Sequence, residues 1–289
     1  MCVDRFPLPG MGQSAVAAAA PGPGPGNWSG APSAAPDGDG GFVVAYRVRL
    51  AGERGSTLIV ARSDDGERLS VVATLSKARF AAESLERPAL VRTESGRWRL
   101  YVCCATPGSK HWWIELLEAS DPAALESADA RVVFPGDEWT GVKDPVIRCW
   151  RGRWHAWICC HPLDEPGEED RMTTAYASSD DGVEWRWHGT VLAGRPTAWD
   201  ARGARVTSVL ADGRASYDGR ARKEENFSER TGLARPAQDR LKGVGRAPVS
   251  DARYLDVVPL DGGGYRLYYE APLADGSHQL RTEHVPGIT

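Results

Sequence analysis

Acidic and cationic side chains stand together where apolar strands are about to begin. Asp144 follows Lys143 in VKDPVI, and Glu86 precedes Arg87 in ERPAL. A neighbouring cation sets the pKa of such a carboxylate, and a pair of carboxylates can act as acid and base at a glycosidic bond. The candidate catalytic acids are therefore Asp144, Glu86, Asp200 in WDARGARVTS and Glu225 in RKEENFSER. Structural ion pairs between buried residues would leave the same pattern in the sequence.

Other side chains near these acids could bind a sugar without reacting with it. Trp112 lies in TPGSKHWW, and a tryptophan beside polar groups commonly stacks on a sugar ring, although a strand aromatic is more often part of the core. The candidate substrate-binding residues are Arg87, Lys110, His111, Trp112, Lys143, Arg205, Tyr217, Asp218, Arg253, Tyr254, Glu270 and His278.

The segment ASYDGRARKEENFSERTGL, residues 215–233, is polar and holds few apolar side chains. It reads either as a mobile lid over a site or as the donor of a catalytic acid. The histidines show no metal-ligand spacing, so we expect no metal and no cofactor.

One pattern, repeated five times, must position these residues. A short apolar strand, a turn ending in glycine and a longer aromatic-rich strand recur about every 50 to 60 residues, a spacing typical of a four-stranded propeller blade. The copies begin at Ala31, Arg87, Asp144, Ala204 and Tyr254. The innermost strand of each propeller blade starts beside the central axis, so these positions should converge there. The sequence predicts an all-β, five-bladed propeller of four-stranded antiparallel blades over residues 27–289.

The chain resembles the five-bladed glycoside hydrolases of family 43 and their relatives in families 32, 68 and 130. The resemblance rests on the repeat, which runs from about Ser29 to the C-terminus, and on VKDPVI and ERPAL at the strand starts. Family 43 enzymes use an Asp base in an Asp-Pro-Ser of the first blade, a pKa-tuning Asp in the third and a Glu acid in the fourth. The resemblance assigns Asp144 to the tuning position. The first-blade segment reads Ala31-Pro32-Ser33, and the fourth blade has no Glu-Gly-Pro. The triad is thus incomplete.

Residues 1–26 form a Pro/Gly/Ala-rich segment that we expect to be a flexible tail. In RSDDGERL and SSDDGVEW, the Asp-Asp-Gly should close structural hairpins. Cys103 and Cys104, like Cys159 and Cys160, are neighbours on strands and are expected to be reduced core residues.

The amino-acid composition limits the classes of binding partner. Lys and Arg number 35 against 39 Asp and Glu, which gives a net charge of −4 and provides no basic field for nucleic acid. No apolar run reaches the roughly 18 residues that span a bilayer. We expect a cytoplasmic monomer without membrane contact that acts on a small saccharide or glycoside, by hydrolysis with inversion or by phosphorolysis. The alternatives are a propeller that binds a carbohydrate or metabolite without cleaving it, and a protein-interaction scaffold.

Overall fold

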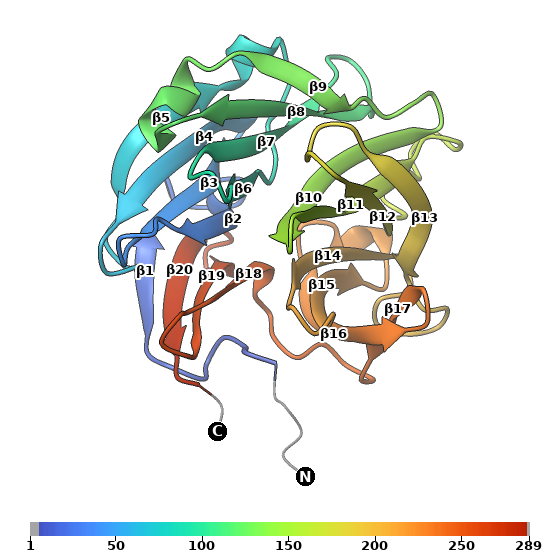
Figure 1. The fold of residues 1–289 in the computed structure, drawn as a ribbon. Coiled ribbons are helices and arrows are strands. Elements are labelled where there is room, and N and C mark those ends of the chain that lie inside the picture. The colour runs from blue at the N-terminus through green and yellow to red at the C-terminus, as the bar shows by residue number, and fades with distance from the viewer. Residues whose placement is uncertain (1–5, 288–289) are drawn as a thin grey trace.

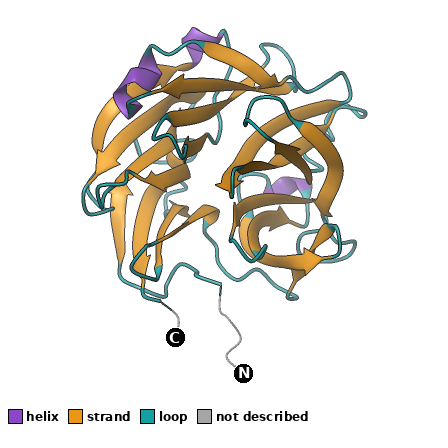
Figure 2. Cartoon of the chain, viewed as in Figure 1, coloured by secondary structure: helices purple, strands orange, loops and turns teal. Residues whose placement is uncertain are grey.

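The computed structural model describes residues 6–287 and is almost entirely β-structure (Figures 1 and 2). The helices within that range are three short 3₁₀ turns, η1 (Lys77–Phe80), η2 (Pro122–Glu126) and η3 (Lys223–Glu225). None of these is long and apolar enough to cross a membrane. The frequent glycines and prolines of the sequence favour turns over long helices.

The strands form five antiparallel groups of four, which we call blades. Blades 2, 3 and 4 are separate sheets, whereas blades 5 and 1 merge into one eight-stranded sheet through a single parallel pair, Trp28 with His278. From the innermost strand outward, blade 1 is β2 (Trp28–Pro36), β3 (Phe42–Leu50), β4 (Arg54–Ser63) and β5 (Ser70–Ser76), and blade 2 is β6 (Ala89–Arg92), β7 (Trp98–Ala105), β8 (Trp112–Ala119) and β9 (Ala130–Phe134).

Blade 3 is β10 (Thr140–Trp150), β11 (Arg153–Pro162), β12 (Thr173–Ser179) and β13 (Arg186–Ala193). Blade 4 is β14 (Gly203–Val209), β15 (Ala215–Arg220), β16 (Arg230–Ala237) and β17 (Arg240–Val244). Blade 5 is β18 (Arg253–Pro259), β19 (Tyr265–Pro272), β20 (His278–Val285) and, as its outermost strand, β1 (Ser14–Ala18).

The five inner strands surround a central axis. Each inner strand contacts the next one around the ring, and β18 contacts β2, so the ring closes (Figure 1). Hydrophobic clusters fill the space between neighbouring blades, for example Leu58 and Leu75 of blade 1 against Leu100 of blade 2. The predicted all-β fold with four-stranded antiparallel blades is confirmed.

Three inner strands share a local distortion near their first residues. Ala31, Asp144 and Tyr254 have φ angles of 52°, 50° and 52°, in the left-handed region, and each lies where the register shifts at a bulge. Such a bulge bends the strand and re-aims its side chains. A left-handed backbone is costly for alanine and tyrosine, so the surrounding structure must hold it in place.

The N-terminal segment differs from the sequence prediction. Ser14–Ala18 forms β1, which pairs antiparallel with β20, and the Phe6 side chain is buried in a cluster with Leu267 and Val285. The prediction of a flexible tail over residues 1–26 is wrong for this part, while residues 1–5 lie outside the described residues. An unpaired β20 would expose a row of backbone donors and acceptors, and β1 covers that edge.

The predicted hairpin turns are confirmed, and so is the core position of three of the four paired cysteines, while Cys160 is only half-buried. Asp65 Oδ1 accepts the backbone amides of Glu67 and Arg68, at 2.8 and 2.9 Å, and Asp181 makes the equivalent pair of bonds in blade 3. These bonds lower the pKa of the Asp65 carboxyl to about 2. The cysteines within residues 6–287 are all free, and Cys103, Cys104 and Cys159 are buried.

Candidate functional site

Two adjoining cavities lie where the inner strands begin. The outer one, the axial pocket, has a volume of about 370 Å³ and is lined by Arg49, Arg54, Glu86, Lys110, Trp112, Lys143, His161, Glu169, Asp170, Asn226 and Phe227. The second, the inner chamber, has a volume of about 40 Å³ and is lined by Arg47, Glu86, Lys143, His161, Met172, Arg205, Arg220, Asn226, Phe227, Glu229, Arg253 and Tyr254. Five residues line both cavities, so the chamber adjoins the pocket.

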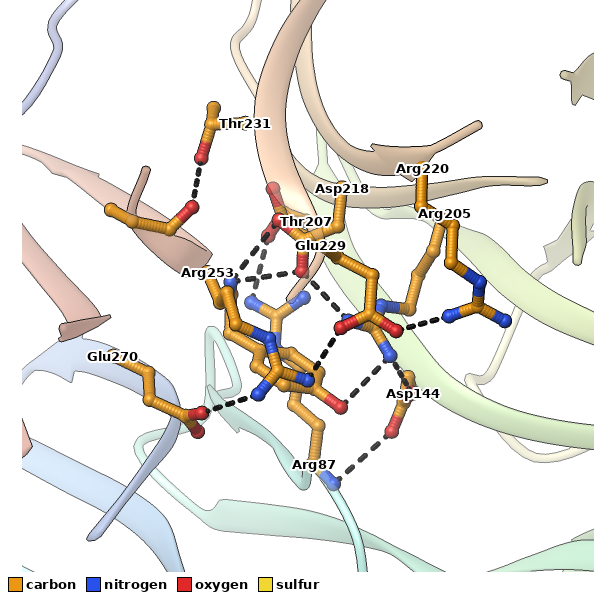
Figure 3. A network of polar contacts seen from close by, with 12 residues as sticks. Arg87, Asp144, Arg205, Thr207, Asp218, Arg220, Glu229, Thr231, Arg253 and Glu270 are labelled. Carbon is orange, nitrogen blue, oxygen red and sulfur yellow. Dashed lines mark hydrogen bonds and ion pairs between the residues drawn. The ribbon is translucent and has the colours of Figure 1, made fainter. Parts of the chain in front are cut away.

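A chain of alternating buried charges surrounds the inner chamber. Arg47 contacts Glu86 and donates from Nη2 to Glu270 Oε2 at 2.8 Å. Arg253 donates from Nη1 to Glu270 Oε1 at 2.8 Å, and its Nη2 lies 2.8 Å from Glu229 Oε2. Glu229 also pairs with Arg220 (Figure 3). Arg220 in turn contacts Asp170. The chain therefore joins residues of all five blades, because Asp170 precedes β12 of blade 3 and Glu86 precedes β6 of blade 2.

Arg205 carries a second, separate cluster. Its Nη1 donates to Asp144 Oδ2 at 2.8 Å and its Nη2 to Asp218 Oδ2 at 2.7 Å (Figure 3). The Tyr254 hydroxyl accepts from the same Nη1 at 2.8 Å, and the guanidinium lies over the Tyr254 ring, 3.9 Å from its centroid. Asp144 Oδ1 also accepts the Arg87 backbone amide at 3.2 Å. Asp144 is thus fully buried as the partner of a guanidinium.

The cations set the ionisation of these acids. Burial alone would raise the pKa of Glu86, but Arg47 and Lys143 outweigh it and hold that pKa at about 2. Burial likewise opposes Arg253 and Arg47 at Glu270, whose pKa is also about 2, and Arg253 and Arg205 lower the pKa of Glu229. At Asp218 burial wins over Arg205 and raises the pKa. A general acid needs a pKa near the working pH, and Glu86, Glu229 and Glu270 do not meet that requirement.

The structure brings most of the predicted residues to the axis. Glu86, Lys110, Trp112 and Lys143 line the axial pocket, and Arg205, Arg253 and Tyr254 line the inner chamber. Directly behind this lining lie the buried partners of those residues, namely Arg87, Asp144, Asp218, Glu270 and His278.

The remaining four predicted residues neither line a cavity nor lie directly behind the lining. Asp200 accepts the Tyr217 hydroxyl at 2.7 Å and the Arg195 Nε at 2.8 Å inside blade 4. Glu225 accepts the Ala221 backbone amide at 2.7 Å, and His111 shares a 2.8 Å hydrogen bond with Thr106. Asp200, Tyr217, Glu225 and His111 therefore have structural partners outside the cavities.

Several residues at the site escaped the sequence prediction. Arg47 is a buried charge inside the apolar strand FVVAYRVRL, which is a signal that could have revealed it. Arg220 is the last residue of β15, and Glu229 directly precedes β16. Both belong to the polar segment 215–233, where the many charged residues gave no sign of which ones line the site. Phe227 in that segment has a φ of 74°, and its ring lies 5.2 Å from the Trp28 ring while the side chain remains 44% exposed. A bulky residue in this backbone region indicates strain of the kind found at ligand sites.

The chemistry of the lining favours binding through hydrogen bonds and stacking. Lys143 lies over the Trp112 ring, 4.7 Å from its centroid, at the boundary of the two cavities. The site also contains buried donors that lack acceptors. The Nε atoms without a hydrogen-bond partner are those of Arg47, Arg205, Arg220 and Arg253. Among the described residues, no group of three His, Cys, Asp or Glu side chains is arranged to hold a metal ion.

Comparison with known proteins identifies the fold. No protein-family model and no curated protein sequence matches the chain. A solved thermostable family-43 glycoside hydrolase superposes with a TM-score of 0.70 at 13% identity, over 89% of each chain. An α-L-arabinofuranosidase from Lactobacillus brevis gives 0.65 at 14% identity over 89% of this chain and 90% of its own. A β-1,2-mannobiose phosphorylase from Listeria innocua gives 0.61 at 14% identity over 98% and 93%. The chain thus has the propeller fold of these glycoside hydrolases and phosphorylases.

Proposed function

We propose that this protein binds a small saccharide or glycoside in the axial pocket, and that the carboxylates around the axis hold the site together instead of cleaving a glycosidic bond. One observation carries the proposal. Glu86, Asp144, Asp218, Glu229 and Glu270 are all buried, and each lies within ion-pair distance of an arginine.

Paired-carboxylate hydrolysis needs one acid that is protonated and one base that reaches a water. Glu86 is the acid of this set that lines both cavities, and with a pKa of about 2 it stays ionised and is a weak base. Asp218 has a raised pKa, but it lines neither cavity and both of its oxygens accept hydrogen bonds. The set lacks the division of roles that the hydrolytic mechanism requires.

The pocket has the features of a sugar site. Its volume falls in the range of small-molecule sites, and polar groups alternate with the Trp112 and Phe227 rings in its lining. An aromatic ring offers an apolar face to the C–H groups of a sugar, while neighbouring charged groups bond its hydroxyls. The solved structures that share the fold include proteins named for their action on glycosides, which supports the same class of ligand.

Hydrolysis or phosphorolysis with Glu86 as its reacting group is the second candidate. It is favoured by the position of Glu86, which borders both cavities at the axial end of a fold found in glycoside hydrolases. This candidate predicts that Glu86→Gln abolishes turnover, whereas the binding proposal predicts that no turnover exists to be lost.

Binding can be tested with methyl α-L-arabinofuranoside, methyl β-D-mannoside, methyl β-D-glucoside and β-1,2-mannobiose, followed by tryptophan fluorescence and calorimetry. We expect at least one of them to bind, and Phe227→Ala to weaken that binding by about fivefold or more through loss of ring contact. Trp187→Ala is the matched control, because Trp187 is equally exposed at 44% but lines a different cavity. No binding up to about 50 mM, or equal binding by Phe227→Ala, would refute the proposal.

A further inference from the structure

Cationic side chains dominate the lining of the two cavities. The lining cations are Arg47, Arg49, Arg54, Lys110, Lys143, Arg205, Arg220 and Arg253, and the lining carboxylates are Glu86, Glu169, Asp170 and Glu229. The lining itself thus holds eight cations against four carboxylates. The whole chain is net acidic, with a charge of −4, so this excess is a local property of the site.

The inner chamber also holds buried donors without acceptors. Arg47, Arg205, Arg220 and Arg253 are almost completely buried, and Nε of each has no hydrogen-bond partner. A guanidinium presents five N–H donors, and leaving a buried charged donor unpaired costs more than leaving a neutral one unpaired. A ligand group that carries negative charge beside these guanidinium groups would offset that cost through its charge.

The two cavities differ in volume, so they can hold different parts of one ligand. The inner chamber, at about 40 Å³, admits a group of only a few atoms, while the axial pocket, at about 370 Å³, has room for a sugar ring. The Trp112 side chain lines the pocket alone and Phe227 lines both cavities, whereas Arg47, Arg205, Arg220 and Arg253 line the chamber alone. A ring that bears one small charged substituent matches this arrangement.

Resting on the proposed saccharide binding, we propose that the ligand is an acidic saccharide whose anionic group enters the inner chamber beside Arg47, Arg205 and Arg253 while its ring occupies the axial pocket. A carboxylate fits the small chamber best, because it is planar and matches the paired donors of a guanidinium. The substrate class is therefore a uronic acid or its glycoside. A phosphate ester offers the same charge in a larger group.

Lys143 is the cation best suited to a test. It lines both cavities and lies over Trp112, and its Nζ lies 3.7 Å from Asp144 Oδ2, farther than Arg205 Nη1, which is 2.8 Å from the same oxygen. Removing its charge should thus weaken ligand binding while Arg205 keeps Asp144 paired. Lys77 is the matched control, because it is half-buried, lines neither cavity and donates from its amino group to the Glu53 carbonyl at 3.0 Å.

The test compares matched acidic and neutral sugars by calorimetry at constant ionic strength. The probes are methyl β-D-glucuronoside against methyl β-D-glucoside, galacturonate against galactose, glucose 6-phosphate, and inorganic phosphate alone. We expect the uronates to bind at least about tenfold more tightly than their neutral partners, which corresponds to one charge-assisted contact. Lys143→Gln should reduce that ratio to about threefold or less, and Lys77→Gln should leave it unchanged.

Each other outcome has a definite meaning. Preference for glucose 6-phosphate over glucuronoside supports the anionic subsite and overturns its assignment to a carboxylate. Equal binding of acidic and neutral sugars overturns the acidic ligand and leaves saccharide binding intact. Inorganic phosphate that binds as tightly as any sugar overturns the role of the ring, and the absence of binding by every probe overturns both this inference and the proposed function.

Discussion

Arg253 and Glu270 lie on neighbouring strands of blade 5 and form a buried ion pair, with Nη1 of the arginine 2.8 Å from Oε1 of the glutamate. The second Nη of Arg253 lies 2.8 Å from Glu229, which belongs to blade 4. Glu270 in turn accepts from Arg47 of blade 1 at 2.8 Å. One pair thereby links three blades at the point where the ring closes, so its removal should affect the whole propeller.

Replacing Arg253 with Met should lower the free energy of unfolding by about 3–5 kcal/mol, because two buried carboxylates lose a partner. Urea denaturation monitored by tryptophan fluorescence measures the change. Arg62→Met is the control, since Arg62 pairs with Asp121 on the surface at 2.6 Å and should cost at most about 1 kcal/mol. Similar losses in the two variants would show that the axial chain of charges has no special structural role.

Gly30→Ala should destabilise the protein by more than about 2 kcal/mol, because a Cβ there would clash with the Glu270 side chain and displace it from Arg47 and Arg253. Gly262→Ala is the control, since a Cβ at Gly262 meets no atom within 4 Å. Chemical denaturation of both variants gives the comparison. If Gly30→Ala were as stable as Gly262→Ala, the close packing of Glu270 against Gly30 would be contradicted.

Acid should weaken the fold over a defined range. The pKa of Glu86 and Glu270 is about 2 in the folded protein against an ordinary 4.5, so their stabilising contribution is complete above about pH 4.5 and is lost as the pH falls towards 2. Asp218, whose pKa is raised, acts in the opposite direction but is a single group. Urea midpoints measured between pH 6 and pH 3 should fall by an amount equivalent to several kcal/mol. A constant or rising midpoint would contradict this electrostatic account.

Phe227 should show a conflict between stability and binding. Its φ of 74° strains any side chain that has a Cβ, so Phe227→Gly should be more stable than Phe227→Ala by about 1 kcal/mol, the reverse of the usual order. Both variants lose the ring and should bind saccharide equally weakly. Thermal unfolding and calorimetry of the two proteins provide the measurement, and a glycine variant less stable than the alanine variant would show that the backbone at this position is not strained.

The repeat made the fold predictable, because each copy carries its own strand and turn signals. The same repeat placed Asp144, Glu86 and Arg205 near one axis, since they open inner strands. The ion-pair partner of each charged residue could not be predicted. Arg47, for example, pairs with Glu86 and Glu270, and both lie far from it along the chain. Asp200 was misjudged for a related reason: its partners Tyr217 and Arg195 turn it into blade 4, which depends on packing and leaves no trace in sequence spacing.

The N-terminal strand was missed because composition outweighed pattern. The Ala-rich run around Ser14–Ala18 has weak strand preference of its own, and it becomes a strand only because β20 offers an open edge. Glu283 on β20 strengthens the attachment, since it accepts the Gly10 backbone amide at 2.9 Å. Tertiary context decided this element, and no local rule applied to residues 1–26 supplies that context.

The most direct test of the central claim is an assay for bond cleavage by the purified protein. Nitrophenyl glycosides of arabinofuranose, mannose, glucose and glucuronic acid would be incubated with and without phosphate, beside the Glu86→Gln variant. We predict no release of nitrophenol by the wild-type protein beyond that of the variant, because the axial carboxylates are held as ion pairs. Turnover by the wild type that Glu86→Gln abolishes, while the variant stays folded, would contradict the account.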